Sequence, residues 1–109
     1  MRSLTNLLGL PLQAFQALNY SYHYEKPASV QAPYMVWQEQ AESSFHSNNS
    51  KSERALEGVC EFYTQTESDP KLDDIENALE GMGASWQLTS VQFEPESELI
   101  HFSWDWSVT

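Results

Sequence analysis

The segment from Leu99 to Thr109, LIHFSWDWSVT, constrains the fold more than any other part of the chain. From Ile100 onward its apolar and polar side chains alternate strictly, and such alternation over about ten residues is typical of a β-strand with one buried face. The apolar face would carry five bulky side chains, at Ile100, Phe102, Trp104, Trp106 and Val108. In a protein of this size they form a large part of the core, so we expect this strand to lie well inside the fold.

The length of the chain predicts a single domain over residues 1–109, because 109 residues can bury one modest core but not two. Hydrophobic residues make up 40% of the sequence, and five Phe, five Tyr and four Trp are among them. This content exceeds that of a typical disordered chain, so we expect the protein to fold despite its acidity.

The charge balance excludes several classes of partner. Sixteen Asp and Glu residues against five Lys and Arg give a net charge of -11. Binding to DNA or RNA depends on neutralising phosphates, so we expect no direct affinity for nucleic acid. The same charge repels anionic lipid, and no apolar run approaches the roughly 20 residues that span a bilayer. We therefore expect a soluble protein with no membrane partner.

The first half of the chain predicts helix, then extended chain, then strand. Ser3 or Thr5 can cap a helix whose apolar stripe continues to Leu18, either as one helix broken at Pro11 or as two short helices. Residues 19–33 are rich in Tyr and carry two prolines, which favours an extended crossing segment, and residues 34–38 form a strand. Residues 39–53 are polar and lack a hydrophobic period, which predicts a long loop.

The second half predicts strand, helix and hairpin. Residues 54–66 alternate as a strand whose buried face includes Gly58 and Cys60, and the glycine there indicates a bulge or close packing. Asp69-Pro70 opens a helix that stops at Gly83, and two strands, 86–93 and 99–108, form an antiparallel hairpin. The order of elements predicts an α+β fold, a mostly antiparallel four-stranded sheet with helices packed on one face.

No arrangement of reactive residues in the sequence predicts an enzyme. Cys60 has no recognisable base beside it and fits a buried strand residue, while His23, His46 and His101 lack the close spacing of a metal site. The chain also lacks a nucleophile elbow and a phosphate-binding glycine loop. We therefore predict no catalytic residue, no metal and no cofactor.

Two segments are candidates for contact with a partner protein. Tyr20, Tyr22 and Tyr24 have alternate spacing, which would place three rings on one side of an extended segment, as at many protein interfaces. The loop 39–53 is the second candidate, because long loops in small domains are commonly functional, although a disordered connection fits it equally well. Its candidate contact residues are Phe45, His46, Asn48 and Asn49.

Most of the chain resembles, in order and pattern, a family of small proteins from phages and prophages of Gram-positive bacteria, the tail-terminator or tail-completion proteins. The resemblance lies in LGLPLQAFQALNYSYHY before PYMVWQE, in FHSNN followed by FYTQTESDP, and in IENALEGMGASWQLTSVQFEPESELIHFSWDWSV. The loop departs from the family pattern, in which an acidic residue precedes the Asn, because this chain has Asn48 and Asn49 there.

The resemblance implies a structural virion protein with no enzymatic activity. Similar proteins form a homo-oligomeric ring, often a hexamer, that caps the tail tube and joins it to the head. The implied partners are the major tail protein and the head-tail connector. The implied location is the virion tail, and the host cytoplasm during assembly.

Two other functions compete with this interpretation. The charge of -11 permits an acidic DNA mimic of the anti-restriction type, in which carboxylates copy a phosphate array. The aromatic residues permit a protein-interaction or ligand-binding module with Tyr and Trp in a cleft. Inhibition of a nuclease would favour the first, and a small molecule retained through purification would favour the second.

Overall fold

The strand predicted from Leu99 onward lies inside a five-stranded sheet in the computed structural model, which describes residues 3–44 and 54–109. This strand, β5 (Leu99–Val108), pairs antiparallel with β3 (Arg54–Thr64) on one side and with β4 (Ser85–Glu94) on the other. β4 is therefore an outer strand of the sheet, and β5 supplies its hydrogen-bonding partner.

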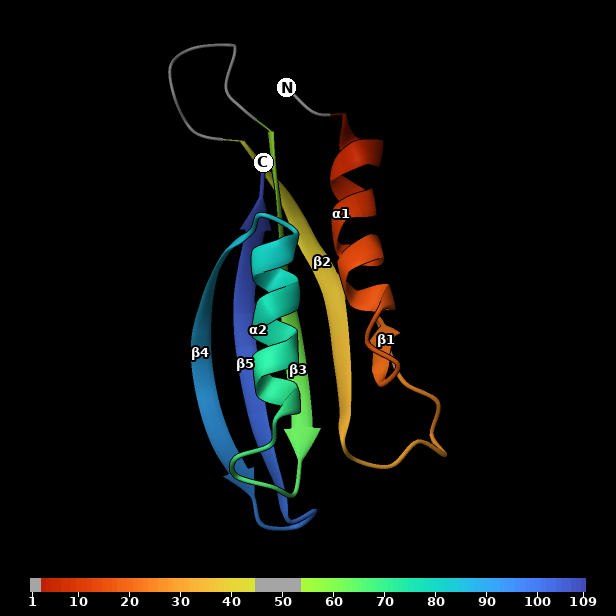
Figure 1. Ribbon diagram of the computed structural model, residues 1–109, viewed down its shortest axis with the longest axis vertical. Helices are drawn as coiled ribbons and strands as arrows, with labels where there is room; N and C mark the ends of the chain where they lie inside the picture. The colour runs from red at the N-terminus through yellow and green to blue at the C-terminus, as the bar shows by residue number, and fades with distance from the viewer. Residues whose placement is uncertain (1–2, 45–53) are drawn as a thin grey trace.

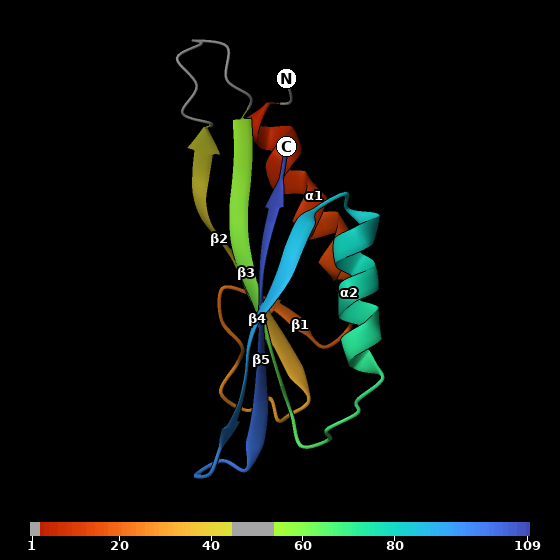
Figure 2. The ribbon, with the colours of Figure 1, turned by 90° about the vertical axis from the view of Figure 1, so that its left-hand side faces the viewer.

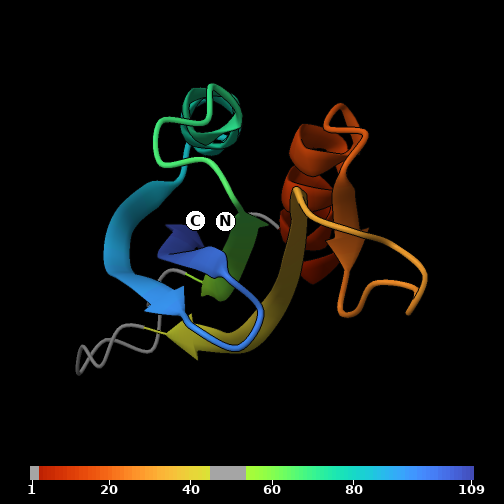
Figure 3. The ribbon, with the colours of Figure 1, turned by 90° about the horizontal axis from the view of Figure 1, so that it is seen from below.

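The other edge of the sheet is formed by β1 (Ser21–His23) and β2 (Tyr34–Ser44). β2 pairs antiparallel with β3, and β1 pairs parallel with β2, so the strand order is β1-β2-β3-β5-β4. The helices α1 (Leu4–Gln16) and α2 (Lys71–Gly81) both lie on one face of this sheet (Figures 1 and 3). Seen with β4 toward the viewer, the opposite face carries no helix among the described residues (Figure 2). The predicted α+β class is confirmed.

The sheet has five strands where four were predicted, and β2 is longer than the strand predicted over residues 34–38. β1 has only three residues and is held by pairing with Met35 to Trp37, so no hydrophobic pattern marks it. Residues 39–44 were predicted as loop, but they continue β2 by pairing with β3 around an irregularity between Glu39 and Ala41. Backbone hydrogen bonds hold this polar extension, which periodicity cannot detect.

α1 passes through Pro11 without a break, which decides between the two arrangements that the sequence left open. Ser3 is the N-cap, since its Oγ accepts a hydrogen bond of 3.1 Å from the backbone N–H of Asn6. Leu7, Pro11 and Phe15 follow at intervals of four residues and are buried. Pro11 therefore belongs to the face that packs on the sheet, where its lost hydrogen bond is offset by apolar burial.

α2 begins and ends as the sequence predicts. One carboxylate oxygen of Asp69 accepts a 2.9 Å hydrogen bond from the backbone N–H of Lys71, and the other accepts one of 2.7 Å from the hydroxyl of Thr64. The Asp69 side chain thus joins the end of β3 to the first turn of α2. Beyond the helix, Gly83 has a φ of +76°, a conformation that favours glycine and stops the helix.

The core lies between the sheet and the two helices. Trp104, Trp106 and Phe62 are its largest buried side chains from the central strands, and Phe15 comes from α1. Two hydrogen bonds of 2.9 Å attach α2 to the hairpin: the indole N–H of Trp104 donates to Glu76, and that of Trp86 donates to Glu80.

Gly58 allows the indole of Trp106 to lie directly against the backbone of β3. The two residues face each other across the β3–β5 pair, and a Cβ at Gly58 would overlap Cζ2 of Trp106 and the carbonyl oxygen of Gln38. The close packing predicted at this glycine is confirmed.

Candidate interaction surface

β4 carries a row of apolar side chains that remain exposed although they point to the core side of the sheet. We call Leu88, Val91 and Phe93 the β4 row; their exposed fractions are 42%, 53% and 60%. They lie opposite Trp104, Phe102 and Ile100 of β5, respectively. Trp104 and Phe102 are buried, so from Leu88 onward the covered part of this face ends at β5 and the apolar face continues beyond it.

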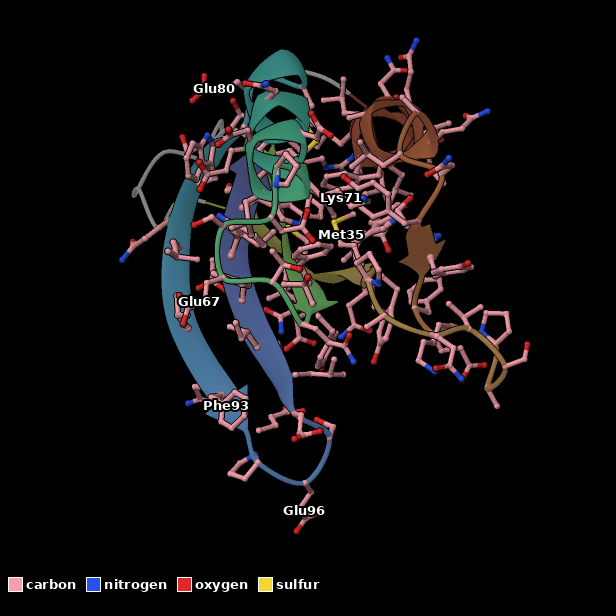
Figure 4. All side chains as sticks on the ribbon, turned by 60° about the horizontal axis from the view of Figure 1, so that its bottom comes forward. Met35, Glu67, Lys71, Glu80, Phe93 and Glu96 are labelled. Carbon is pink, nitrogen blue, oxygen red and sulfur yellow. The ribbon has the colours of Figure 1, made fainter. Side chains whose placement is uncertain are left out.

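Val91 and Phe93 of the β4 row border a hollow on the surface. The hollow has a volume of about 580 Å³, and its lining residues are Gln65, Glu67, Val91, Phe93, Ile100 and Phe102. Figure 4 shows Phe93 on β4 well away from α2, on the same side of the sheet as that helix. An apolar side chain from another protein could therefore enter the hollow beside Phe93 and be removed from water.

A β-bulge places the three side chains of the β4 row on one face. Leu88 and Val91 are three residues apart, so a regular strand would direct them to opposite faces. The register shifts between Leu88 and Ser90, and Thr89 is the extra residue. Its hydroxyl donates a hydrogen bond of 3.1 Å to the carbonyl oxygen of Ser103 on β5. The odd spacing in the sequence was the available signal for this row, and sequence reasoning missed it.

The free edge of β4 has few of the features that usually protect an outer strand. Edge strands commonly carry lysine, proline or inward-pointing charge, which discourages pairing with another chain. From Ser85 to Phe93 the sequence SWQLTSVQF has no charged residue and no proline. The bulge at Thr89 and Glu94 at the strand end are the protective features present. A long, uncharged edge beside exposed apolar side chains is typical of a surface that another protein covers.

The three tyrosines of the first candidate segment do not share one face, so that geometric prediction is wrong. Tyr20 lies in the turn before β1 and packs on the core residue Phe62, with ring centroids 5.9 Å apart. Tyr22 lies in β1 beside Val36, whereas Tyr24 has a φ of +73° and is 59% exposed. The left-handed backbone at Tyr24 ends the alternation on which the prediction rested.

The candidate contact residues of the loop lie outside the described residues. These are Phe45, His46, Asn48 and Asn49. Their role at an interface stays a prediction, as does that of Tyr20, Tyr22 and Tyr24.

Three stacked rings and one carboxylate pack together at the β1 edge of the sheet. The imidazole of His23 lies between the rings of Tyr24 and Trp37, at centroid distances of 3.9 and 3.8 Å. Its Nε2 is 2.9 Å from Oε1 of Glu39. Burial alone would raise the pKa of Glu39, but hydrogen bonds from His23 and Tyr24 outweigh it and hold that pKa below its usual value of 4.5. This contact ties β1 to β2.

Residue types of a catalytic triad meet on the helix-free face, but their geometry does not suit catalysis. Nε2 of His101 is 2.9 Å from Glu61 and 3.4 Å from the hydroxyl of Ser103. Nδ1 of the same ring is 3.5 Å from Glu94. Because Glu61 engages the nitrogen that would have to accept the proton of Ser103, this cluster lacks the serine–base–orienter order.

Cys60 is fully buried on β3, and burial raises the pKa of its thiol. A thiol in this environment stays protonated and is a poor nucleophile, which agrees with the structural role predicted for it. Within residues 3–44 and 54–109, no three His, Cys, Asp or Glu side chains are placed to hold a metal ion. In the same part of the chain, no helix has the length and apolarity required to cross a membrane.

Comparison with known proteins finds likenesses among solved structures. The chain matches no protein-family model. No curated protein matches its sequence. Among solved structures, it is similar to a chain of the virion of a native gene transfer agent particle, with 6% sequence identity and a TM-score of 0.47. The alignment covers 96% of this chain and 92% of that one.

Proposed function

We propose that this protein is a structural virion component of a tailed phage or prophage, a tail terminator that assembles as a ring and caps the tail tube at the head-tail junction. The resemblance of the sequence to tail-terminator proteins suggests this role and suggests six copies in the ring. The observation in the structure that carries it is the β4 row beside an uncharged free edge. Such a surface serves binding to another protein.

The same proposal assigns the partners and the place of action. The partners are further copies of this chain, the major tail protein and the head-tail connector. The protein acts in the virion tail, after assembly in the host cytoplasm. It needs no cofactor and catalyses no reaction in this role.

The first test is light scattering on a size-exclusion column, with and without the neighbouring major tail protein, followed by negative-stain microscopy. We expect a ring, alone or at the ends of tail tubes. A protein that stays monomeric and leaves the tubes uncapped would contradict the proposal.

A pair of charge substitutions on β4 makes this test specific. Val91→Asp places a carboxylate in the β4 row and should abolish capping. Gln92→Asp places the same charge on the next residue, which is also exposed but faces the other side of the sheet. It should leave capping unchanged, and circular dichroism should show that both variants fold. If Val91→Asp caps tail tubes as well as Gln92→Asp does, the β4 row has no part in capping.

A second candidate function rests on the helix-free face. Carboxylates from three adjacent strands point there, and they are Glu57, Glu61, Glu94 and Asp105. An acidic face of this kind could occupy the DNA site of a nuclease. Inhibition of a restriction nuclease that is lost in the double variant Glu57→Gln and Asp105→Asn would support this function over the first.

A further inference from the structure

We infer that the β4 row is covered by helix α1 of a second copy of this chain, in a head-to-tail contact. The inference rests on the proposed function in one respect, because it names the subunit contact that would close the ring. It starts from two surfaces of the same molecule, the β4 row and a row of leucines along one flank of α1.

α1 has an exposed apolar ridge of its own. Leu4, Leu8 and Leu12 follow at intervals of four residues and therefore lie along one side of the helix. Leu4 is 39% exposed and Leu12 is 46% exposed, while Leu8 is half-buried. An isolated surface leucine is ordinary, but a ridge of three on one helix exposes a continuous apolar strip.

The charge of the protein favours contact through these two surfaces. Each copy carries a net charge of -11, so two copies repel each other wherever their carboxylates come close. α1, with the sequence LTNLLGLPLQAFQ, contains no charged residue, and neither does β4 from Ser85 to Phe93. A contact between α1 and β4 therefore buries apolar surface without bringing like charges directly together.

The two surfaces also match in length. Eight residues of helix separate Leu4 from Leu12, which corresponds to roughly 12 Å at 1.5 Å per residue. Leu88 and Phe93 are five residues apart in a strand shortened by the bulge, which corresponds to roughly 14 Å. The leucine ridge can therefore lie along the whole β4 row.

The position of the two surfaces makes the contact head-to-tail. α1 lies at the β1–β2 side of the sheet, and β4 forms the opposite edge (Figures 1 and 3). One molecule therefore cannot cover its own β4 row with its own α1. In a pair, one α1 ridge and one β4 row stay free, and further copies can add until a ring closes. In such a ring, α1 of the neighbour would continue the layer that α2 begins.

Two complementary variants test this contact. Leu12→Asp keeps the β4 row but loses the ridge, and Val91→Asp keeps the ridge but loses the row. A carboxylate buried in either surface should raise the dissociation constant of self-association roughly a hundredfold. Each variant alone should be monomeric in light scattering, whereas an equimolar mixture should form a one-to-one dimer that grows no further, because it retains one intact contact.

A disulfide provides a second measurement. Leu12→Cys in one preparation and Val91→Cys in another should form a mixed dimer under mild oxidation. Leu12→Cys with Gln92→Cys is the matched control and should not. The native Cys60 is buried and should not react.

The outcomes separate the inference from the proposed function. Assembly of Leu12→Asp alone, or a mixture that stays monomeric while the wild type assembles, would overturn the inference. A wild type that stays monomeric at its highest soluble concentration, with and without tail tubes, together with Leu12→Cys and Val91→Cys variants that form no mixed disulfide, would also overturn it. If Leu12→Asp still caps tubes, the function stands and this contact fails. If the mixture of Leu12→Asp and Val91→Asp forms dimers but the wild type caps no tube, the contact is supported and the proposed function is wrong.

Discussion

Gly58 is a residue at which the addition of one methyl group should lower the stability of the fold. The indole of Trp106 occupies the position that a Cβ would need, and the backbone of β2 closes the other side. Gly58→Ala should lower the free energy of unfolding by about 1–3 kcal/mol through overpacking. Gly9→Ala is the matched control, since Gly9 lies inside α1 and an added Cβ would meet open space there, and it should raise stability by about 0.5–1 kcal/mol.

Urea unfolding monitored by tryptophan fluorescence measures both changes. Equal effects of the two substitutions would mean that Gly58 is not the tight position that we describe. The sequence predicted close packing at Gly58 because glycine interrupts an otherwise bulky strand face, but it could not identify Trp106, 48 positions away, as the cause.

Glu39 should make the protein less stable in acid. Its pKa is lowered in the folded state, so its contribution is present above the unfolded value near 4.5 and is lost as the pH falls through the folded value. Glu39→Gln should cost about 0.5–1.5 kcal/mol at neutral pH, because it weakens the hydrogen bonds to His23 and Tyr24. The variant should also lose part of the acid slope. Denaturant unfolding at a series of pH values measures this, and an unchanged slope would contradict it.

Among the elements, α2 is attached to the hairpin by two hydrogen bonds that should differ in strength. The indole N–H of Trp104 is buried, so Glu76→Ala leaves a donor without a partner and should cost about 1–3 kcal/mol. Glu80 accepts from Trp86 at an exposed position, so water can replace it and Glu80→Ala should cost less than about 1 kcal/mol. Thermal unfolding of the two variants gives the comparison, and a larger loss for Glu80→Ala would contradict the assignment.

An element was predictable from the sequence where its own side chains determine its structure. The alternating side chains of residues 99–108 predicted β5, and Asp69-Pro70 predicted the start of α2. Both predictions are correct, because the residues of each element are enough to determine it. β1 and the polar half of β2 were missed, because pairing with distant strands holds them. The β4 row was missed for a related reason: the bulge at Thr89 shifts the face of every later residue, and a fixed period of two hides it.

For the whole molecule, salt should strengthen self-association. Copies that each carry -11 repel one another over distances of about 8–10 Å at physiological ionic strength, and added salt screens this repulsion. A contact made of leucine, valine and phenylalanine has no ion pair to lose. The dissociation constant measured by analytical ultracentrifugation should therefore fall as sodium chloride rises. A dissociation constant that rises with salt would indicate an interface built on ion pairs instead.

The strand order also has a consequence for folding during synthesis. β5 lies between β3 and β4, although it follows both of them in the chain. While the ribosome is still making residues 99–108, β4 has no strand to pair with and β3 has only β2, so the sheet cannot close in the order in which it is translated. Residues 85–93 of β4, which carry no charge, therefore stay unpaired until β5 has emerged. During this interval nascent chains on one polysome are most exposed to association with each other.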